Sequence, residues 1–98
     1  MLDQIDIPRE RIADFCRRWH IRKLAFFGSV LTDEFGPDSD VDVLVEFEPG
    51  HVPGLEYVDA QEELSRILGR KVDLSTPSFI SRHFRDKVVA EAHVAYAK

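Results

Sequence analysis

The sequence predicts an α+β fold, in which a small mixed β-sheet carries helices mainly on one of its faces. Apolar residues recur at helical spacing in three segments, and between these segments they cluster or alternate at strand spacing. The expected order of elements is α-β-(α)-β-α-β-α, which suits a sheet covered by helices. A length of 98 residues fits one compact domain spanning residues 1–98, and no repeat or linker divides it.

The first predicted element is an amphipathic helix that begins near Pro8. Proline suits the first helical turn because an N–H there would lack a helical partner in any case. Residues 23–27 then read as a short buried strand that Gly28 ends, and residues 30–35 as a short helix before a turn at Gly36. The apolar stripe of the first helix follows the spacing i, i+3, i+4, i+7 and comprises Ile12, Phe15, Cys16 and Trp19.

Residues 40–48 form the second predicted strand, in which two kinds of side chain alternate. Aspartate is a poor strand former, so two aspartates at the start of a β-branched run need an explanation. One face of the strand carries Val41, Val43, Val45 and Phe47, and the other carries Asp40, Asp42, Leu44 and Glu46.

The rest of the chain is expected to supply two more helices around a short strand. The second helix ends at Gly69, a suitable C-terminal cap, and a strand covers residues 71–74. A third helix opens over residues 75–77 and ends near Glu91, whereas residues 92–98 fit either a final strand or a frayed turn. The buried faces of these helices carry Tyr57, Ala60, Leu64, Ile67 and Leu68 in the second, and Ile80, Phe84 and Val88 in the third.

Composition narrows the functional classes. A net charge of −5 argues against a protein that grips free nucleic acid through its phosphates, since that requires a basic surface. The single cysteine, Cys16, rules out an internal disulfide and a cysteine-rich zinc site, and its apolar stripe favours a buried thiol. Neither a signal sequence nor a membrane-spanning run is present, which gives a cytoplasmic protein without a membrane partner as the default. Because so small a domain is modestly stable, a partner or a second copy of the chain could contribute.

Asp40 and Asp42 are the sharpest anomaly in the sequence. Residues i and i+2 of a strand lie on one side, roughly 6.5–7 Å apart, so their carboxylates can converge on one or two divalent ions. An ordinary strand with a wet acidic face is the alternative that the pair alone leaves open. A calcium loop starting at Asp38 is excluded, because Val43 stands where that loop needs glycine and Pro49 where it needs glutamate.

Two further features strengthen the metal interpretation, although each alone also fits a plain turn or a surface aspartate. Ten residues separate Gly28-Ser29 from Asp40, and a glycine and a serine after a strand let N–H groups and a hydroxyl approach an anion. Asp73 is the carboxylate of the short third strand, and three carboxylates converge if that strand lies beside residues 40–42. Two metal ions held by carboxylates are what in-line nucleotidyl transfer uses.

Gly28-Ser29, ten intervening residues and Asp40-Val41-Asp42 resemble the nucleotidyltransferase motif of the DNA polymerase β superfamily in type and spacing. Over nearly its whole length the chain is similar to the minimal nucleotidyltransferases, the MNT domains often encoded beside a HEPN-domain toxin. The matching stretches are residues 26–29, 37–47 and 69–74. The resemblance implies a palm-like nucleotidyltransferase fold.

The resemblance also implies a role for each motif residue. Asp40 and Asp42 would be metal ligands, and Asp73 would be a third ligand or the general base for the incoming hydroxyl. Gly28 and Ser29 would hold the triphosphate of the nucleotide. The implied ion is Mg²⁺, one or two per site, with ATP as the donor. A nucleoside monophosphate would pass to a hydroxyl of a HEPN-type partner or of a small molecule, and free nucleic acid is the least expected acceptor.

One departure from the family pattern leaves a second function open. Family members commonly carry arginine soon after Gly-Ser, whereas residues 30–33 read Val-Leu-Thr-Asp here. If no other cation replaces that arginine, the chain would be an antitoxin that neutralises a HEPN-type partner by contact, with little or no catalysis. The four histidines show no ligand spacing, and Arg17 and Arg18 read as a solvated helix face that could also meet an acidic partner. The candidate replacement cations are Arg22, Lys23, Arg70 and Lys71.

Overall fold

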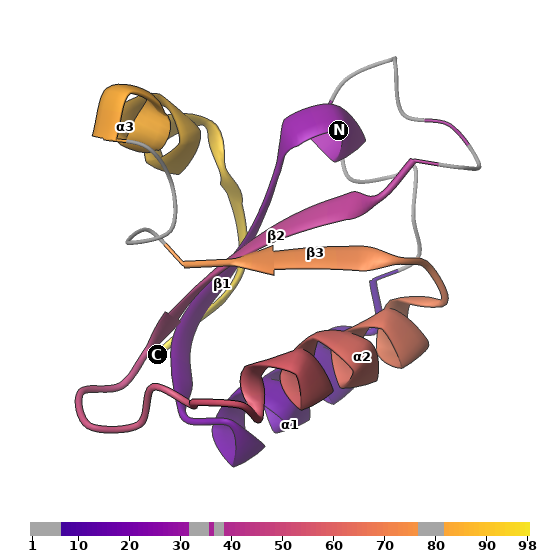
Figure 1. The fold of residues 1–98 in the computed structure, drawn as a ribbon. Helices are drawn as coiled ribbons and strands as arrows, with labels where there is room; N and C mark the ends of the chain where they lie inside the picture. The colour runs from indigo at the N-terminus through magenta and orange to yellow at the C-terminus, as the bar shows by residue number, and fades with distance from the viewer. Residues whose placement is uncertain (1–6, 32–35, 37–38, 77–81) are drawn as a thin grey trace.

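The computed structural model describes residues 7–31, 36, 39–76 and 82–98 (Figure 1). Within these ranges the order of helices and strands agrees with the predicted order, and a further strand follows at the end. The elements are α1 (Arg9–Arg18), β1 (Ile21–Phe27), the 3₁₀ turn η2 (Gly28–Leu31), β2 (Val41–Phe47), α2 (Tyr57–Leu68), β3 (Val72–Ser75), α3 (Arg82–Glu91) and β4 (His93–Ala97).

The four strands form one mixed sheet in the order β3-β2-β1-β4. Strand β1 is antiparallel to both β2 and β4, whereas β3 is parallel to β2. Two register positions matter for function: Phe27 pairs with Asp42 across β1 and β2, and Asp42 pairs with Asp73 across β2 and β3. The predicted α+β class with a small mixed sheet is therefore confirmed.

Helices α1 and α2 lie side by side against one face of the sheet, whereas α3 lies apart from them (Figure 1). This arrangement confirms the prediction that helices pack mainly on one face. None of the helices in the described ranges is long and apolar enough to cross a membrane. The core between the two helices and the sheet includes Ile12, Phe15, Cys16, Leu24, Phe26, Val43, Val45, Ala60, Leu64 and Leu74.

The alternation predicted for β2 places its two sets of side chains on opposite faces of the sheet. Val41, Val43 and Val45 are completely buried in the core. Asp42 is half-buried on the other face, where its neighbour Leu44 is also buried. The face away from α1 and α2 therefore combines carboxylates with an apolar floor.

Several boundaries differ from the sequence predictions. Pro8 is the N-cap of α1 rather than a residue of its first turn. Ser75 ends β3 instead of opening a helix, because it pairs with Leu44 of the neighbouring strand. Residues 93–97, which the local pattern left undecided, form β4 by pairing with β1.

Two predictions fall partly or wholly outside the described residues. Of the short helix predicted over residues 30–35, only the end of η2 is described. Residues 77–81 of the third predicted helix, which was expected to open over residues 75–77, also lie outside, while its end at Glu91 is confirmed.

Candidate active site

Asp42 and Asp73 lie at paired positions on neighbouring strands. Because β2 and β3 are parallel and Asp42 is opposite Asp73, both side chains extend from the same face of the sheet. Paired strands lie about 4.8 Å apart, so these two carboxylates can approach one ligand. The expected placement of the Asp73 strand beside residues 40–42 is thus found in the structure.

Gly28 lies directly against the Asp42 carboxylate. It follows β1, whose last residue, Phe27, is the register partner of Asp42. Its φ of +76° is in the left-handed region, and a Cβ at this position would overlap Oδ2 of Asp42 and lie 3.1 Å from its Cγ. Both conditions restrict the position to glycine. Ser29 follows in η2, and its side chain lies outside the described atoms, so its predicted phosphate contact stays a prediction.

Asp40 lies one residue before β2 and carries a half-exposed side chain. Its Oδ2 is 4.0 Å from Nζ of Lys71, whose side chain is 82% exposed. A backbone hydrogen bond next to this ion pair is shorter, since the N–H of Val41, the residue after Asp40, donates to the carbonyl of Lys71 at 2.9 Å. An exposed ion pair at this distance is weak, so Lys71 can turn from Asp40 towards a bound phosphate.

Arg22 and Lys23 lie too far along β1 to replace the missing arginine. Both lie 3.8 Å from the Glu46 carboxylate. Lys23 is four residues before Phe27, which corresponds to about 13 Å along a strand. These two candidates are therefore wrong, because they occupy the opposite end of the sheet from Asp42.

Arg70 supports the backbone that leads into the acidic strand. Its Nη2 donates to the carbonyl of Gly36 at 2.6 Å. That carbonyl also accepts the N–H of Ser39 at 3.1 Å, and the N–H of Gly36 donates to Oγ of Ser39 at 3.0 Å. Arg70 thus holds the turn before Asp40, which leaves Lys71 as the better candidate for a phosphate contact.

The carboxylates fit Mg²⁺ as part of a site that a bound nucleotide would complete. Among the described residues, no three His, Cys, Asp or Glu side chains lie close enough together to hold a metal ion by themselves. Mg²⁺ is commonly held by one or two carboxylates together with substrate phosphates and waters. Asp42 and Asp73 supply two carboxylates from paired strands, and the half-exposed Asp40 side chain can rotate towards them.

Tyr57 belongs to the surroundings of the site, although the sequence assigned it only to a buried helix face. Its hydroxyl donates to the carbonyl of Leu74, one residue beyond Asp73, at 2.5 Å. Burial raises the pKa of Tyr57 to about 12, and the nearby Asp73 charge adds to the rise. The hydroxyl therefore stays a donor near neutral pH. No local pattern reveals this contact, because it depends on which strand α2 packs against.

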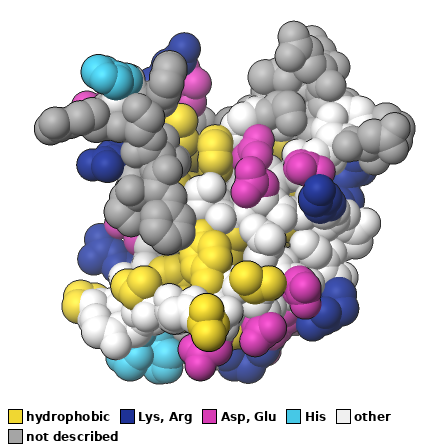
Figure 2. All heavy atoms as spheres, viewed as in Figure 1, with side chains coloured by type: hydrophobic (Ala, Val, Ile, Leu, Met, Phe, Trp, Pro, Cys, Tyr) yellow, Lys and Arg dark blue, Asp and Glu magenta, His cyan; other side chains and the backbone are white. Residues whose placement is uncertain are grey.

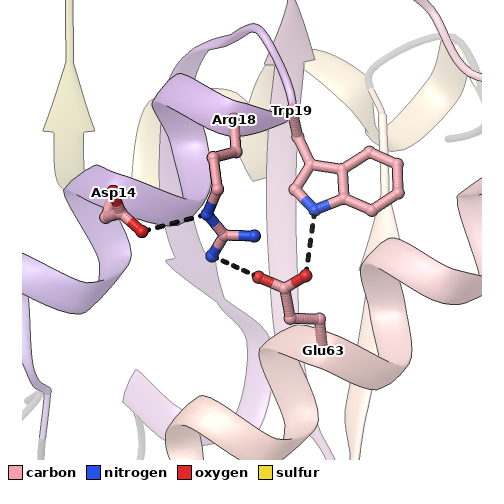
Figure 3. Close-up of polar contacts among 4 residues, drawn as sticks. All are labelled: Asp14, Arg18, Trp19 and Glu63. Atoms are coloured by element: carbon pink, nitrogen blue, oxygen red, sulfur yellow. Dashed lines mark hydrogen bonds and ion pairs between the residues drawn. The ribbon is translucent and has the colours of Figure 1, made fainter.

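A polar cluster joins α1 to α2 (Figure 3). Arg18 lies 2.9 Å from Asp14 on its own helix and 2.5 Å from Glu63 on α2, while Trp19 Nε1 donates to the other Glu63 oxygen at 3.4 Å. The hydrogen bond from Arg18 is the main reason why the pKa of Glu63 is lowered. Arg18 is half-exposed, as predicted for a solvated helix face, and the acidic partner that it meets, Glu63, lies 45 residues away in the sequence.

Apolar side chains are exposed near the start of α2. Figure 2 shows acidic side chains over β2 and β3, and hydrophobic side chains gathered over the start of α2 on the same side of the molecule. We call three exposed apolar residues at and just before the start of α2 the apolar ridge: Val52 (68% exposed), Leu55 (96%) and Val58 (56%). Exposed apolar groups that gather in one place are typical of protein interaction sites.

Comparison with known proteins gives a matching family and several similar relatives. A family model described as nucleotidyltransferase domain matches residues 9–96. The protein adenylyltransferase MntA of Thermococcus cleftensis is 36% identical over 75 residues, which cover 76% of this chain and 74% of that protein.

Two of the solved structures that share the fold are informative. One, a "putative minimal nucleotidyltransferase", is 33% identical with a TM-score of 0.72 and covers 86% of this chain and 85% of that one. The other is an MNT antitoxin in complex with a tri-AMPylated Shewanella oneidensis HEPN toxin, at a TM-score of 0.65 over 92% of this chain and 70% of that one. Its 18% identity shows a common fold alone. Together the matches confirm the resemblance to minimal nucleotidyltransferases.

Proposed function

The chain belongs to the nucleotidyltransferase domain family, and on this basis we propose that it moves the AMP group of ATP to a hydroxyl of a partner protein with the help of Mg²⁺. The observation that carries the proposal is the pairing of Asp42 with Asp73 on one sheet face, with Gly28 packed against Asp42. The two carboxylates therefore lie beside the backbone of Gly28, which has no side chain to shield it.

In the proposed reaction the acceptor oxygen attacks the α-phosphorus of ATP, and the bond to the leaving pyrophosphate breaks. Asp73, on the edge strand β3, would accept the proton of the hydroxyl; if Asp73 instead holds the ion with Asp42, that proton passes to solvent. Mg²⁺ bound by Asp40 and Asp42 would neutralise phosphate charge and align the attacking and leaving oxygens. Lys71 would contact the triphosphate, since its exposed ammonium lies beside Asp40.

The observations favour a hydroxyl of a partner protein as the acceptor. This partner would be a HEPN-type toxin, for which the chain would act as antitoxin. The Thermococcus relative is named a protein adenylyltransferase, and the Shewanella structure contains an AMPylated HEPN toxin with its MNT antitoxin. The apolar ridge offers a surface for a protein contact, whereas a net charge of −5 does not suit free nucleic acid.

The test is transfer of label from ATP labelled at the α-phosphate to a HEPN-type protein, the class of partner proposed above. We expect Asp42→Asn to lower the transfer by about 100-fold or more, because it removes charge that stabilises the transition state. Chelation of Mg²⁺ should stop the reaction. Asp59→Asn, an exposed aspartate of α2, is the matched control and should retain full activity. Absence of transfer by the wild-type protein, or equal transfer by Asp42→Asn, would refute the proposal.

The apolar ridge also favours a second function, in which the chain neutralises its partner by contact alone. A contact antitoxin needs the ridge and not the carboxylates. Co-expression with the toxic partner separates the two functions, because Asp42→Asn leaves the ridge residues unchanged. Full protection of the cells by Asp42→Asn would indicate contact, whereas loss of protection would indicate chemistry.

A further inference from the structure

Within the described part of the chain, no strand pairs with the outer side of β3. The order β3-β2-β1-β4 places β2 on one side of β3, and helix α2 packs against β3 from the core side (Figure 1). Backbone N–H and C=O groups at such an edge need other partners when they are shielded from water. Side chains of α2 supply these partners.

Three side chains of α2 bind the outer backbone groups of β3. The Tyr57 hydroxyl donates to the carbonyl of Leu74 at 2.5 Å, and the N–H of Leu74 donates to Oε1 of Gln61 at 3.0 Å. The N–H of Val72 donates to Oγ of Ser65 at 3.1 Å. Because Tyr57, Gln61 and Ser65 are spaced by four residues, they lie in a row on one helix face. We call this row the edge ladder.

The edge ladder forms hydrogen bonds with the backbone of the two residues that flank Asp73. The carbonyl of Lys71 accepts the N–H of Val41, so alternate residues of this segment direct their backbone groups towards β2. Asp73 shares that direction with Lys71, whereas Val72 and Leu74 direct theirs to the ladder. The Asp73 backbone is therefore fixed between β2 and α2.

The ladder is well suited to fixing a position. Ser65 Oγ donates to the carbonyl of Gln61 at 3.0 Å, so the lone pair that receives the Val72 N–H is held in a defined direction. The Tyr57 ring also packs against Phe47, with ring centroids 6.4 Å apart, which limits the movement of its hydroxyl. β3 has four residues, and pairing with β2 alone would leave so short a strand able to shift.

We propose that Tyr57, Gln61 and Ser65 are positioning residues that set the distance between the Asp73 and Asp42 carboxylates. The expected effect of this positioning on catalysis rests on the proposed function. The positioning of the Asp73 backbone itself rests on the three hydrogen bonds alone. Removing one ladder contact should lower kcat for AMP transfer about 10-fold, because misplacement by a fraction of an ångström already weakens catalysis. For variants of Tyr57 and Gln61 the KM for ATP should not change, because both bind Leu74, which lies on the other side of Asp73 from Lys71.

The test compares Gln61→Met, which lacks the acceptor oxygen, with Gln61→Glu, which keeps one at similar length. In Gln61→Met the amide proton of Leu74 should exchange with solvent about 5- to 10-fold faster, and Gln61→Glu should restore slow exchange and kcat together. Tyr57→Phe should lower kcat in the same way. The other tyrosine, Tyr96, provides the matched control, because Tyr96→Phe lies on β4 and should leave kcat unchanged.

Two outcomes would overturn the positioning role while leaving the proposed function intact. One is faster Leu74 exchange in Gln61→Met at unchanged kcat, and the other is equal loss of kcat in Gln61→Glu. Broadening of NMR amide signals by added Mn²⁺ tests the positioning role even if the wild-type protein transfers no AMP. The Asp42 and Asp73 signals should broaden together in the wild type, and the Asp73 effect should weaken in Gln61→Met. Equal broadening in both proteins would overturn the proposal, whereas missing transfer with intact broadening would overturn only the proposed function.

Discussion

Replacement of Gly28 by alanine tests the contact on which the candidate site depends. Gly28 has a φ of +76°, and an added Cβ would overlap Oδ2 of Asp42 and lie 3.1 Å from its Cγ. The carboxylate would have to move by roughly 1 Å to reach an ordinary van der Waals separation. The substitution should therefore displace a metal-binding group as well as strain the backbone.

The two effects can be separated by a matched substitution elsewhere in the chain. Gly50 has a φ of +81°, and nothing lies within 4 Å of a Cβ built there. Alanine in the left-handed region costs about 1–2 kcal/mol, so Gly50→Ala should lower the free energy of unfolding by that amount without touching the site. Gly28→Ala should have the same backbone cost, and its additional effect should fall on Asp42.

The assay measures the free energy of unfolding in urea and the rate of AMP transfer for both variants. A displacement of about 1 Å at a reacting centre can cost about 100-fold in rate, so Gly28→Ala should lose activity on that scale while remaining folded. Gly50→Ala should keep its transfer rate. Equal rates for the two variants would show that Gly28 does not position Asp42, and the reasoning would then be refuted.

Three further predictions follow from charges and burial. Lys71→Glu should raise the KM for ATP about 10-fold or more, with a smaller effect in high salt, because it places a repulsive charge beside the triphosphate; an unchanged KM would remove Lys71 from the site. The pKa of Glu63 is lowered by Arg18, so its charge stabilises the fold above its ordinary pKa of 4.5 and this contribution is lost as the pH falls through the lowered value. Glu63→Gln should therefore lower the free energy of unfolding at pH 7 by about 0.5–1 kcal/mol, and urea unfolding should show this difference shrinking below pH 4.5, whereas a constant difference would contradict it. Burial raises the pKa of Cys16 to about 12, so a thiol reagent at pH 8 should label Cys16 only in unfolded protein, and rapid labelling of native protein would contradict its burial.

Local sequence patterns predicted the features that depend on neighbouring residues. The alternation of β2 correctly separated Asp42 from the buried valines, because successive side chains of a strand point to opposite faces. Gly69 was correctly predicted as the helix cap, and its φ of +68° is one that glycine adopts readily.

Contacts between distant segments were beyond such patterns. Residues 93–97 become a strand only because β1 offers them an edge, with Val94 paired to Ala25. The same limit applies to Arg18 and Glu63, and to Tyr57 and Leu74, whose partners depend on how α1, α2 and β3 pack. Choosing Lys71 among the candidate cations needed the tertiary structure, which places Lys71 beside Asp40.

Asp73 provides the most direct test of the central claim that paired carboxylates on β2 and β3 transfer AMP. The measurement is the intact mass of the HEPN-type partner after incubation with ATP, Mg²⁺ and either the wild-type chain or Asp73→Asn. The wild type should add the mass of one or more AMP groups, and Asp59→Asn should do the same. Asp73→Asn should leave the partner unmodified, whereas modification equal to that by the wild type would contradict the proposed site.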